Sequence, residues 1–300
     1  MTIKILICDK IADEGIKIME GKGYQVTRAW TTPKNQLAKM VNDYDAVIVR
    51  SATKVTAELL TNADKLRVIG RAGEGLDNID LRKAAEMGIE VVNTPHVAAV
   101  SVAELTIAHL LALARGIVEG TMSLREGKWI KEQLMGVEVC GKTLGIVGCG
   151  SIGKTVERLA LALGMKVIGV DMCVYGRFVT LEEMLPQADF VSVHVPLTPH
   201  TRHMISTKEF AMMKDGVMLV DCSRGGVVDE EALYQALVSG KVKAAALDVF
   251  EEEPPKNSRL LRLGNVHATP HIGAQTVEAQ LKSSVLVAER VIAALEKAAS

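Results

Sequence analysis

The chain has 300 residues, about two domains' worth, and its formal net charge of −1 without a basic block argues against a nucleic-acid or membrane-surface partner. Its five cysteines are scattered, which indicates neither a disulfide framework nor a zinc site and fits a reducing cytoplasm. No apolar stretch approaches the ~20 residues of a membrane span, so we expect a cytoplasmic protein without a membrane partner.

Short apolar, β-branched runs alternate with segments of helical period along the chain. Such runs are typical of parallel strands that are covered on both faces, and the segments between them predict helices. The runs cover residues 3–9, 45–51, 66–73 and 89–95 in the first part, then 143–148, 165–171, 189–196, 216–222, 242–249 and 265–270. Two such series predict two α/β domains, each with a doubly wound parallel sheet.

Two helical segments lie outside this alternation. Residues 97–114 predict one long apolar helix, which we expect to pack between domains or against another subunit. Residues 274–299 predict a terminal helix that returns to the first domain. The expected domains are therefore residues 1–96 plus 275–300, and residues 97–274, with residues 97–140 as an interdomain and dimerisation segment.

A glycine-rich turn, GIVGCGSIGK, follows the first strand of the second series and opens a helix. In its G-x-G-x-x-G pattern, Gly148 permits a tight turn, Gly150 lets the backbone approach a pyrophosphate and Gly153 allows close helix–strand packing. The next strand ends at Asp171, the position of a carboxylate that binds ribose hydroxyls. This context predicts a Rossmann dinucleotide site. Because Asp171 would repel a 2′-phosphate, NAD is favoured over NADP, and Arg177 would weaken that preference.

A nicotinamide enzyme that acts on a hydroxyl or carbonyl group needs a proton donor, usually His, and a cation for an anionic substrate. His194 and His271 lie at or just beyond strand ends of the second sheet, where open α/β sheets bind their ligands. His109 lies on the apolar helix and is expected to be a packed residue. Arg224, in a turn with two glycines directly after a strand, is a candidate cation. The glutamate run at 251–253 is by itself typical of a solvated loop.

The chain resembles the NAD-dependent D-2-hydroxyacid dehydrogenase family, and within it the D-3-phosphoglycerate dehydrogenases. The resemblance runs nearly from end to end and rests on the ordered strings GIVGCGSIGK, VSVHVPLTPHTRHMI, VDCSRGGVVDEEAL, AAALDVFEEEPP and ATPHIGA. It implies a Rossmann NAD-binding domain, a flavodoxin-like substrate domain and oxidation of 3-phospho-D-glycerate. A glyoxylate, hydroxypyruvate or other small 2-oxo acid reductase stays open as an alternative, as does an NAD(H)-sensing corepressor-like binding protein.

The same resemblance implies the site residues. Arg224 matches the substrate-binding arginine, His271 the acid/base and Glu253 its carboxylate partner, which leaves Glu251 and Glu252 as solvated residues. The implied cofactor contacts are Gly148, Gly150, Ser151, Ile152, Gly153, Asp171, His194, Val195, Pro196, Cys222, Ser223, Arg224, Asp248 (at the nicotinamide end), His271, Gly273 and Ala274. The implied contacts of the small anionic 2-hydroxy or 2-oxo acid are Arg50, Ser51, Gly73, Glu74, Gly75, Arg224 and His271, and no metal is implied.

The resemblance also bears on assembly and regulation. Trp129 and Lys131 match a segment that reaches a neighbouring subunit in relatives, which implies a homodimer or a higher homo-oligomer. Nothing follows the terminal helix that would form a regulatory domain, so we expect no inhibition by serine through one. Two positions depart from the phosphoglycerate pattern. Glu74 adds a negative charge beside the loop expected to bind the substrate carboxylate, and Ala98 stands where that pattern often has an asparagine.

Overall fold

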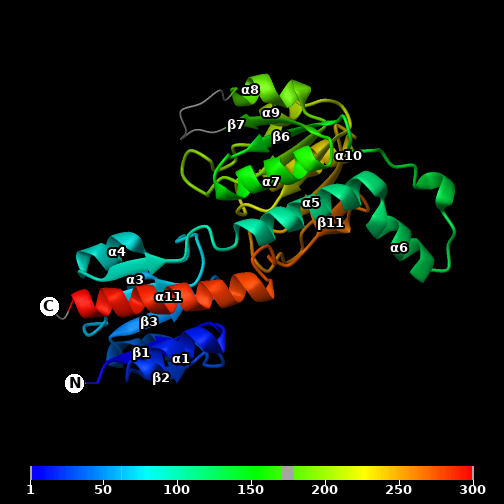
Figure 1. Cartoon of the computed structure of the whole chain (residues 1–300). Coiled ribbons are helices and arrows are strands. Elements are labelled where there is room, and N and C mark those ends of the chain that lie inside the picture. Colours follow the sequence, from blue (N-terminus) through cyan, green and yellow to red (C-terminus); the bar gives the residue numbers. More distant parts are fainter. Residues whose placement is uncertain (1, 62, 171–178, 299–300) are drawn as a thin grey trace. The chain divides into compact units, whose positions relative to one another are not determined.

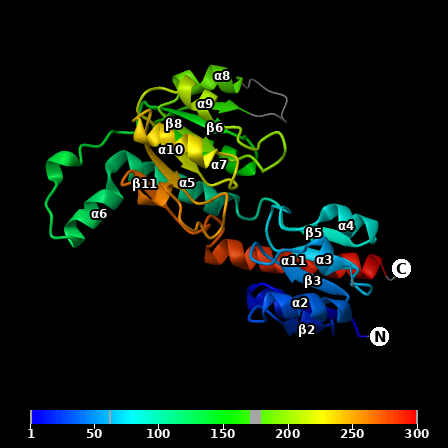
Figure 2. The same cartoon turned by 180° about the vertical axis from the view of Figure 1, so that it is seen from behind.

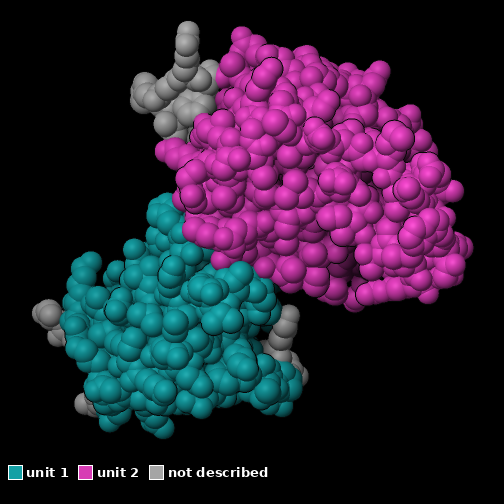
Figure 3. Space-filling view, turned by 45° about the vertical axis from the view of Figure 1, so that its right-hand side comes forward, with its two compact units in different colours: residues 1–98, 275–300 teal, residues 99–274 magenta. Residues whose placement is uncertain are grey.

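The computed structural model describes residues 2–61, 63–170 and 179–298. The chain divides into two compact units, which Figure 3 colours separately. Unit 1 comprises Met1–Ala98 and Gln275–Ser300, and unit 2 comprises Ala99–Ala274. Unit 1 is therefore built from both ends of the chain.

Unit 1 contains a five-stranded parallel sheet in the order β2-β1-β3-β4-β5, with helices on both faces (Figure 1). This is the flavodoxin-like order of a doubly wound sheet. Its strands are β1 (Lys4–Ile7), β2 (Gln25–Arg28), β3 (Ala46–Val49), β4 (Val68–Arg71) and β5 (Glu90–Asn93). Its helices are α1 (Asp13–Gly21), α2 (Lys34–Met40), α3 (Ala57–Leu60), α4 (Leu81–Glu86) and α11 (Val277–Lys297), with a 3₁₀ turn η1 at Val41–Asp43.

The two faces of this sheet have separate cores. Ile5 and Ile7 point to the face that α1 and α11 cover, whereas Leu6, between them, points to the opposite core. The terminal helix lies directly against α1, because a Cβ on Gly15 would collide with Ser284 of α11. The C-terminal segment thus closes one face of unit 1.

Unit 2 contains a six-stranded parallel sheet in the order β11-β10-β9-β8-β6-β7 (Figure 2). The sheet is doubly wound, because the strand order reverses at β6. Its strands are β6 (Thr143–Val147), β7 (Lys166–Val170), β8 (Phe190–Val193), β9 (Val217–Asp221), β10 (Val242–Leu247) and β11 (Val266–Ala268). Its helices are α5 (Ala99–Arg115), α6 (Ile117–Arg125), α7 (Ser151–Ala162), α8 (Leu181–Met184), α9 (Thr207–Met212) and α10 (Glu230–Val238), with 3₁₀ turns at Lys131–Gln133, Leu185–Gln187 and Leu260–Arg262.

The long apolar helix of the sequence is α5, which packs on α7, β9 and β10 within unit 2. It ends at Arg115. The next residue, Gly116, has a φ of 60° in the left-handed region, and α6 then continues in a new direction. Within the described residues, no single helix has the length and apolar character needed to cross a membrane. Only α5 and α6 taken together meet those criteria, and they are bent by 65°.

One row of paired residues runs across five strands of unit 2 and aligns the ends of those strands. Its members, linked by strand register, are Val147, Val193, Asp221, Leu247 and Ala268. Because the strands are parallel, the residues that follow this row leave the sheet at the same edge. Those residues are Gly148, His194, Cys222, Asp248 and Thr269. This carboxyl edge is where doubly wound sheets bind their ligands.

Candidate active site

The glycine turn after β6 has the backbone geometry that its pattern predicts. Gly148 has a φ of +97°, and a Cβ there would lie 2.8 Å from the backbone of His194. A Cβ on Gly153 would collide with the carbonyl oxygen of Gly148. A Cβ on Gly150 would meet no atom of the described residues within 4 Å. The turn is therefore tightly packed at Gly148 and Gly153 and open at Gly150.

The first turn of α7 is suited to a phosphate. Gly150 is the N-cap residue and supplies no side-chain hydrogen bond, so the N–H groups of Ser151 and Ile152 point from the helix N-terminus toward the open side. An NAD pyrophosphate fits this arrangement, since Gly150 leaves room for it. Asp171, expected to bind the ribose, lies outside the described residues.

The loop after β8 borders the glycine turn. His194 donates its backbone N–H to the carbonyl of Val147 at 2.7 Å. Both ring nitrogens of His194 are buried and have no hydrogen-bond partner among the described residues, and burial lowers the pKa of this imidazole to about 3. The ring is therefore neutral at neutral pH. Val195 is half-buried and Pro196 is exposed, beside it.

The loop after β9 is fixed by Asp221. Its carboxylate accepts hydrogen bonds from the Ser223 hydroxyl at 2.6 Å and the Ser223 N–H at 2.9 Å. Burial raises the pKa of Asp221 to about 7, with a smaller upward contribution from Asp248, although the Ser223 hydrogen bonds and Arg224 act in the opposite direction. The thiol of Cys222 is buried beside Thr106 of α5. Ser223 and Cys222 thus hold the start of the turn that carries Arg224.

The Arg224 turn lies against the segment that carries Glu253. A Cβ on Gly225 would collide with the backbone of Phe250, and Gly226 has a φ of +86°. The guanidinium of Arg224 donates to the Ser223 carbonyl at 2.7 Å and is close enough to lower the pKa of Glu253. Glycine at 225 is therefore what allows the cation and the carboxylate to lie close together.

Glu253 and His271 form a bidentate contact. The Nδ1 atom of His271 lies 2.8 Å from Oε2 and 3.0 Å from Oε1 of Glu253. Both side chains are partly exposed, at 33% for His271 and 38% for Glu253. Nε2 of His271 makes no hydrogen bond within the part of the chain that the structure describes, so it is the nitrogen left to exchange a proton with a ligand.

A buried carboxylate fixes the turn that carries His271. Asp248 is 1% exposed and accepts hydrogen bonds from the Ile272 N–H and the Gly273 N–H, each at 2.8 Å, and from the Thr269 hydroxyl at 2.6 Å. The expected contact of Asp248 with the nicotinamide stays a prediction, because these three donors belong to the chain itself. Ala274 follows Ile272 and Gly273 and is the last residue of unit 2.

The contact with His271 helps to lower the pKa of Glu253. Burial raises the pKa of its carboxyl, but the hydrogen bond and charge of His271, the Phe250 N–H and the Arg224 guanidinium together bring it below its usual value. The ionised Glu253 carboxylate therefore faces Nδ1 of His271.

We expect Glu253→Gln to move the His271-dependent limb of the pH–rate profile to lower pH. An imidazolium stabilised by a carboxylate releases its proton at higher pH, and glutamine keeps a hydrogen-bond acceptor while removing the charge. The measurement is kcat/KM against pH for the wild type and the variant. Glu252→Gln, at an exposed position, is the matched control and should leave the limb in place. An unmoved limb in Glu253→Gln would contradict the pairing.

The substrate residues expected in the first domain lie in unit 1, after β3 and β4. Arg50 donates through its side chain to the Gln275 amide oxygen at 3.0 Å and through its backbone N–H to Asp9 at 2.6 Å. Burial lowers the pKa of Arg50, and Asp9 opposes this effect. Asp9 also accepts from the Thr53 hydroxyl at 2.8 Å, so the loop that contains the exposed Ser51 is anchored at both ends.

Glu74 lies in the loop after β4, between Gly73 and Gly75. Its carboxylate contacts Nδ1 of His96 at 3.6 Å, and its carbonyl accepts a hydrogen bond from the Asn93 side chain at 2.7 Å. Its side chain is 40% exposed. The negative charge noted in the sequence is therefore turned toward His96 of the same unit.

Sequence reasoning missed two contacts and two residues around the site. Glu251 is exposed, as expected, and its carboxylate also contacts Nε2 of His203 at 3.1 Å. His109 is packed, as expected, but its Nε2 also lies 3.1 Å from the Thr269 hydroxyl. Neither Thr269 nor Asp221 was singled out, although each stands next to a predicted strand end in the sequence.

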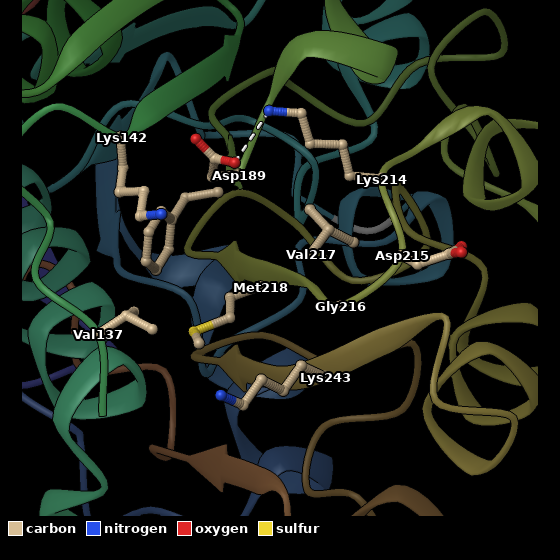
Figure 4. A pocket seen from close by; sticks show the side chains of 10 residues that line it. Val137, Lys142, Asp189, Lys214, Asp215, Gly216, Val217, Met218 and Lys243 are labelled. Atoms are coloured by element: carbon tan, nitrogen blue, oxygen red, sulfur yellow. Dashed lines mark hydrogen bonds and ion pairs between the residues drawn. The ribbon is translucent and has the colours of Figure 1, made fainter. Parts of the chain in front are cut away.

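A cavity of about 120 Å³ lies elsewhere in unit 2 (Figure 4). Its lining includes Lys142, Asp189 and Gly216, which precede or begin β6, β8 and β9. These residues lie at the amino ends of the strands. The cavity is therefore at the opposite edge of the sheet from the candidate site and contains none of the expected site residues.

Comparison with known proteins agrees with this geometry. Residues 107–273 match the family described as "D-isomer specific 2-hydroxyacid dehydrogenase, NAD binding domain". A D-3-phosphoglycerate dehydrogenase of Methanocaldococcus jannaschii is 47% identical over 96% of this chain, which spans only 57% of that relative's length. A hydroxypyruvate reductase of Thermotoga maritima is also 47% identical, over 96% of this chain and 97% of its own.

Among solved structures, the TT0316 protein from Thermus thermophilus superimposes with a TM-score of 0.90 at 36% sequence identity, covering 98% of this chain and 97% of that chain. The glycine turn, the Arg224 turn and the Glu253–His271 pair all lie within residues 107–273. The chain therefore belongs to the D-isomer specific 2-hydroxyacid dehydrogenase family and carries its NAD-binding domain.

Proposed function

We propose that the protein is an NAD-dependent D-2-hydroxyacid dehydrogenase that oxidises 3-phospho-D-glycerate to 3-phosphohydroxypyruvate. The observation that carries the proposal is the contact of His271 Nδ1 with Glu253 at 2.8 Å, close to Arg224 and at the same sheet edge as the glycine turn. A proton donor, a cation and a phosphate-binding turn are the groups that this reaction needs. The 47% identity to the M. jannaschii enzyme supports the substrate.

In this proposal NAD supplies the hydride acceptor, or NADH the hydride donor, and the chain controls the proton and the orientation. During oxidation, His271 Nε2 takes the proton of the C2 hydroxyl while the C2 hydride leaves, which converts the alcohol to a ketone. During reduction, the same nitrogen returns the proton to the ketone oxygen. Glu253 stabilises the protonated ring and fixes Nδ1 as its hydrogen-bonding nitrogen.

Arg224 has the planar fork that binds a carboxylate through two parallel hydrogen bonds. Its proposed role is to hold the C1 carboxylate and polarise the C2 oxygen, which gains negative charge as the ketone is reduced. Arg50, Ser51 and the Gly73–Gly75 loop are proposed to contact the substrate's anionic groups. Two hydrogen bonds that fix the position of Arg50 support this role. Asp9 accepts from its backbone N–H, and Gln275 accepts from its side chain.

A second candidate is reduction of a small 2-oxo acid such as hydroxypyruvate or glyoxylate. Two observations favour it. The T. maritima hydroxypyruvate reductase matches over nearly its whole length, and Glu74 places a carboxylate in the proposed substrate loop, where it would repel a second anionic group such as phosphate. The Glu74 carboxylate is turned toward His96, and phosphoglycerate stays the first candidate.

Turnover of a panel of acids by the purified protein tests the proposal. The panel contains 3-phosphoglycerate and D-glycerate with NAD or NADP, and hydroxypyruvate, glyoxylate and pyruvate with NADH or NADPH. We expect the highest kcat/KM for 3-phosphoglycerate and a preference for NAD. Higher efficiency with hydroxypyruvate or glyoxylate would select the second candidate. NADH binding without turnover of any acid would overturn both and favour a cofactor-sensing binding protein.

The proposal includes a homodimer in the cytoplasm. Exposed apolar side chains gather on α6 and the segment after it, and Met122, Leu124, Trp129 and Met135 are 48–84% exposed. Burying such side chains against a second copy would remove apolar surface from water. None of the four described cysteines forms a disulfide bond, which agrees with a reducing compartment. Sedimentation velocity tests the assembly, and a single monomeric species would contradict it.

A further inference from the structure

A chain of buried hydrogen bonds lies beneath the turn that carries His271. Nε2 of His109, on α5, is 3.1 Å from the Thr269 hydroxyl, which is 2.6 Å from Oδ1 of Asp248. The same carboxylate binds the N–H groups of Ile272 and Gly273. His109 is 7% exposed and Asp248 is 1% exposed. The hydrogen bonds thus link α5, the residue after β10 and the loop after β11.

The directions of these hydrogen bonds follow from the number of protons available. Thr269 has one hydroxyl proton and gives it to Asp248, so its oxygen can only accept from His109. His109 must then carry a proton on Nε2. Burial lowers the pKa of His109, an effect that His267 strengthens and Asp248 opposes. A neutral ring with its proton on Nε2 is the form that the chain of hydrogen bonds requires.

The turn above this chain has a conformation that needs support. His271 has a φ of 52°, in the left-handed region that side chains rarely adopt. Its N–H donates to the Thr269 carbonyl at 3.0 Å, and the next two N–H groups donate to Asp248. Strained backbone persists where its surroundings over-determine it. Here the Asp248 carboxylate stabilises the strained backbone through two hydrogen bonds to the turn. Its third hydrogen bond comes from the Thr269 hydroxyl.

On the other side of Thr269, the strand is anchored independently. Nε2 of His267 lies 2.9 Å from Oε1 of Glu119 on α6, and the His267 side chain is 3% exposed. Movement of residues 269–273 is therefore restricted at one end by His267 and at the other by Asp248. Loss of the Thr269 hydroxyl would loosen only the second anchor.

We infer that Thr269 is a positioning residue for His271. Its hydroxyl, oriented by His109, holds Asp248 in the geometry that binds the Ile272 and Gly273 N–H groups, and this fixes the direction in which the His271 ring projects. The inference rests on the proposed function, because it concerns the residue that exchanges the proton.

Matched substitutions test this inference by steady-state kinetics with the best 2-oxo acid of the panel and NADH. Thr269→Val removes the hydroxyl with little change in shape, and we expect kcat to fall about 10- to 100-fold, as a misplacement of about 1 Å can cause. KM and the Kd of NADH should stay within about threefold of the wild type. Thr269→Ser keeps the hydroxyl and should restore kcat to within about threefold.

The primary deuterium isotope effect on kcat reports on the chemical step. It distinguishes a displaced His271 from a smaller fraction of folded protein. With NADH deuterated at the transferred position, we expect a larger primary isotope effect on kcat in Thr269→Val, because a displaced His271 slows the chemical step. A loss of folded protein would lower kcat and leave the isotope effect unchanged. Ser284→Ala, which removes a fully buried hydroxyl from α11 of unit 1, is the control and should keep the wild-type isotope effect.

His109 gives a second, independent pair of variants. His109→Leu should reproduce the Thr269→Val effect, and the double variant should lose no more than the single variants, since both break the same chain of hydrogen bonds. His109→Gln, which can place an amide donor near the position of Nε2, should retain more activity than His109→Leu. Wild-type kcat and isotope effect in Thr269→Val, or no rescue by Thr269→Ser, would overturn the inference.

Amide hydrogen exchange keeps this test separate from the proposed function. If the wild type turns over no acid in the panel, the proposed function fails and exchange in residues 269–273 decides about Thr269. The N–H groups of Ile272 and Gly273 should exchange slowly in the wild type and in Thr269→Ser, and faster in Thr269→Val. Equal exchange rates in all three proteins would overturn the inference.

Discussion

His271→Ala is expected to lower kcat by about 10²–10⁴-fold, the contribution typical of a positioned general acid or base. The imidazole is the group whose Nδ1 contacts Glu253 and whose Nε2 remains open to a ligand. The Kd of NADH should stay within about threefold, because the glycine turn and the N-terminus of α7 are untouched. Stopped-flow NADH oxidation and a fluorescence titration with NADH measure the two quantities.

His200→Ala is the matched control for this prediction, because His200 is an exposed histidine of the same unit. It should keep wild-type turnover. Turnover by His271→Ala near the wild-type rate would remove this histidine from the mechanism. Loss of NADH binding together with turnover would instead show that His271 holds the cofactor site together.

Arg224→Met is expected to lower kcat/KM by roughly 30- to 5,000-fold, mostly through a higher KM for the acid. Truncating one partner of a desolvated, hydrogen-bonded charge pair costs about 2–5 kcal/mol, and each 1.36 kcal/mol is about tenfold in rate. The guanidinium is held for this role by the Ser223 carbonyl and by the tight turn at Gly225.

Arg224→Lys separates charge from geometry. Lysine keeps the positive charge but cannot form two parallel hydrogen bonds to a carboxylate, so it should recover only part of the lost kcat/KM. Arg262→Met, at an exposed position of the same unit, is the control. Unchanged KM and kcat in Arg224→Met would show that another residue binds the substrate carboxylate.

Most of the fold could be predicted from the sequence because buried parallel strands are continuous apolar runs. All six strands of unit 2 were predicted. The strand orders confirm two doubly wound parallel sheets, with the flavodoxin-like order in unit 1. The strand β2 was missed. It is an edge strand in which Gln25 and Arg28 are exposed, so it lacks the apolar run on which the prediction depended.

The candidate site could be predicted only in part. The glycine pattern is local, so spacing alone indicated it. The Glu253–His271 contact joins residues 18 positions apart, and the resemblance to a family, not spacing, selected these two residues. The contact between His109 and Thr269 joins residues 160 positions apart. It depends on how α5 packs against the ends of β10 and β11, which no local pattern encodes.

A single-turnover experiment tests the central claim most directly. The protein, in excess over NADH, is mixed with 3-phosphohydroxypyruvate or hydroxypyruvate, and NADH absorbance and proton uptake are followed together. We predict that the wild type oxidises NADH and takes up one proton per hydride, and that His271→Ala binds NADH but oxidises it at least 10²-fold more slowly. Wild-type protein that binds NADH and transfers hydride to neither acid would contradict the account.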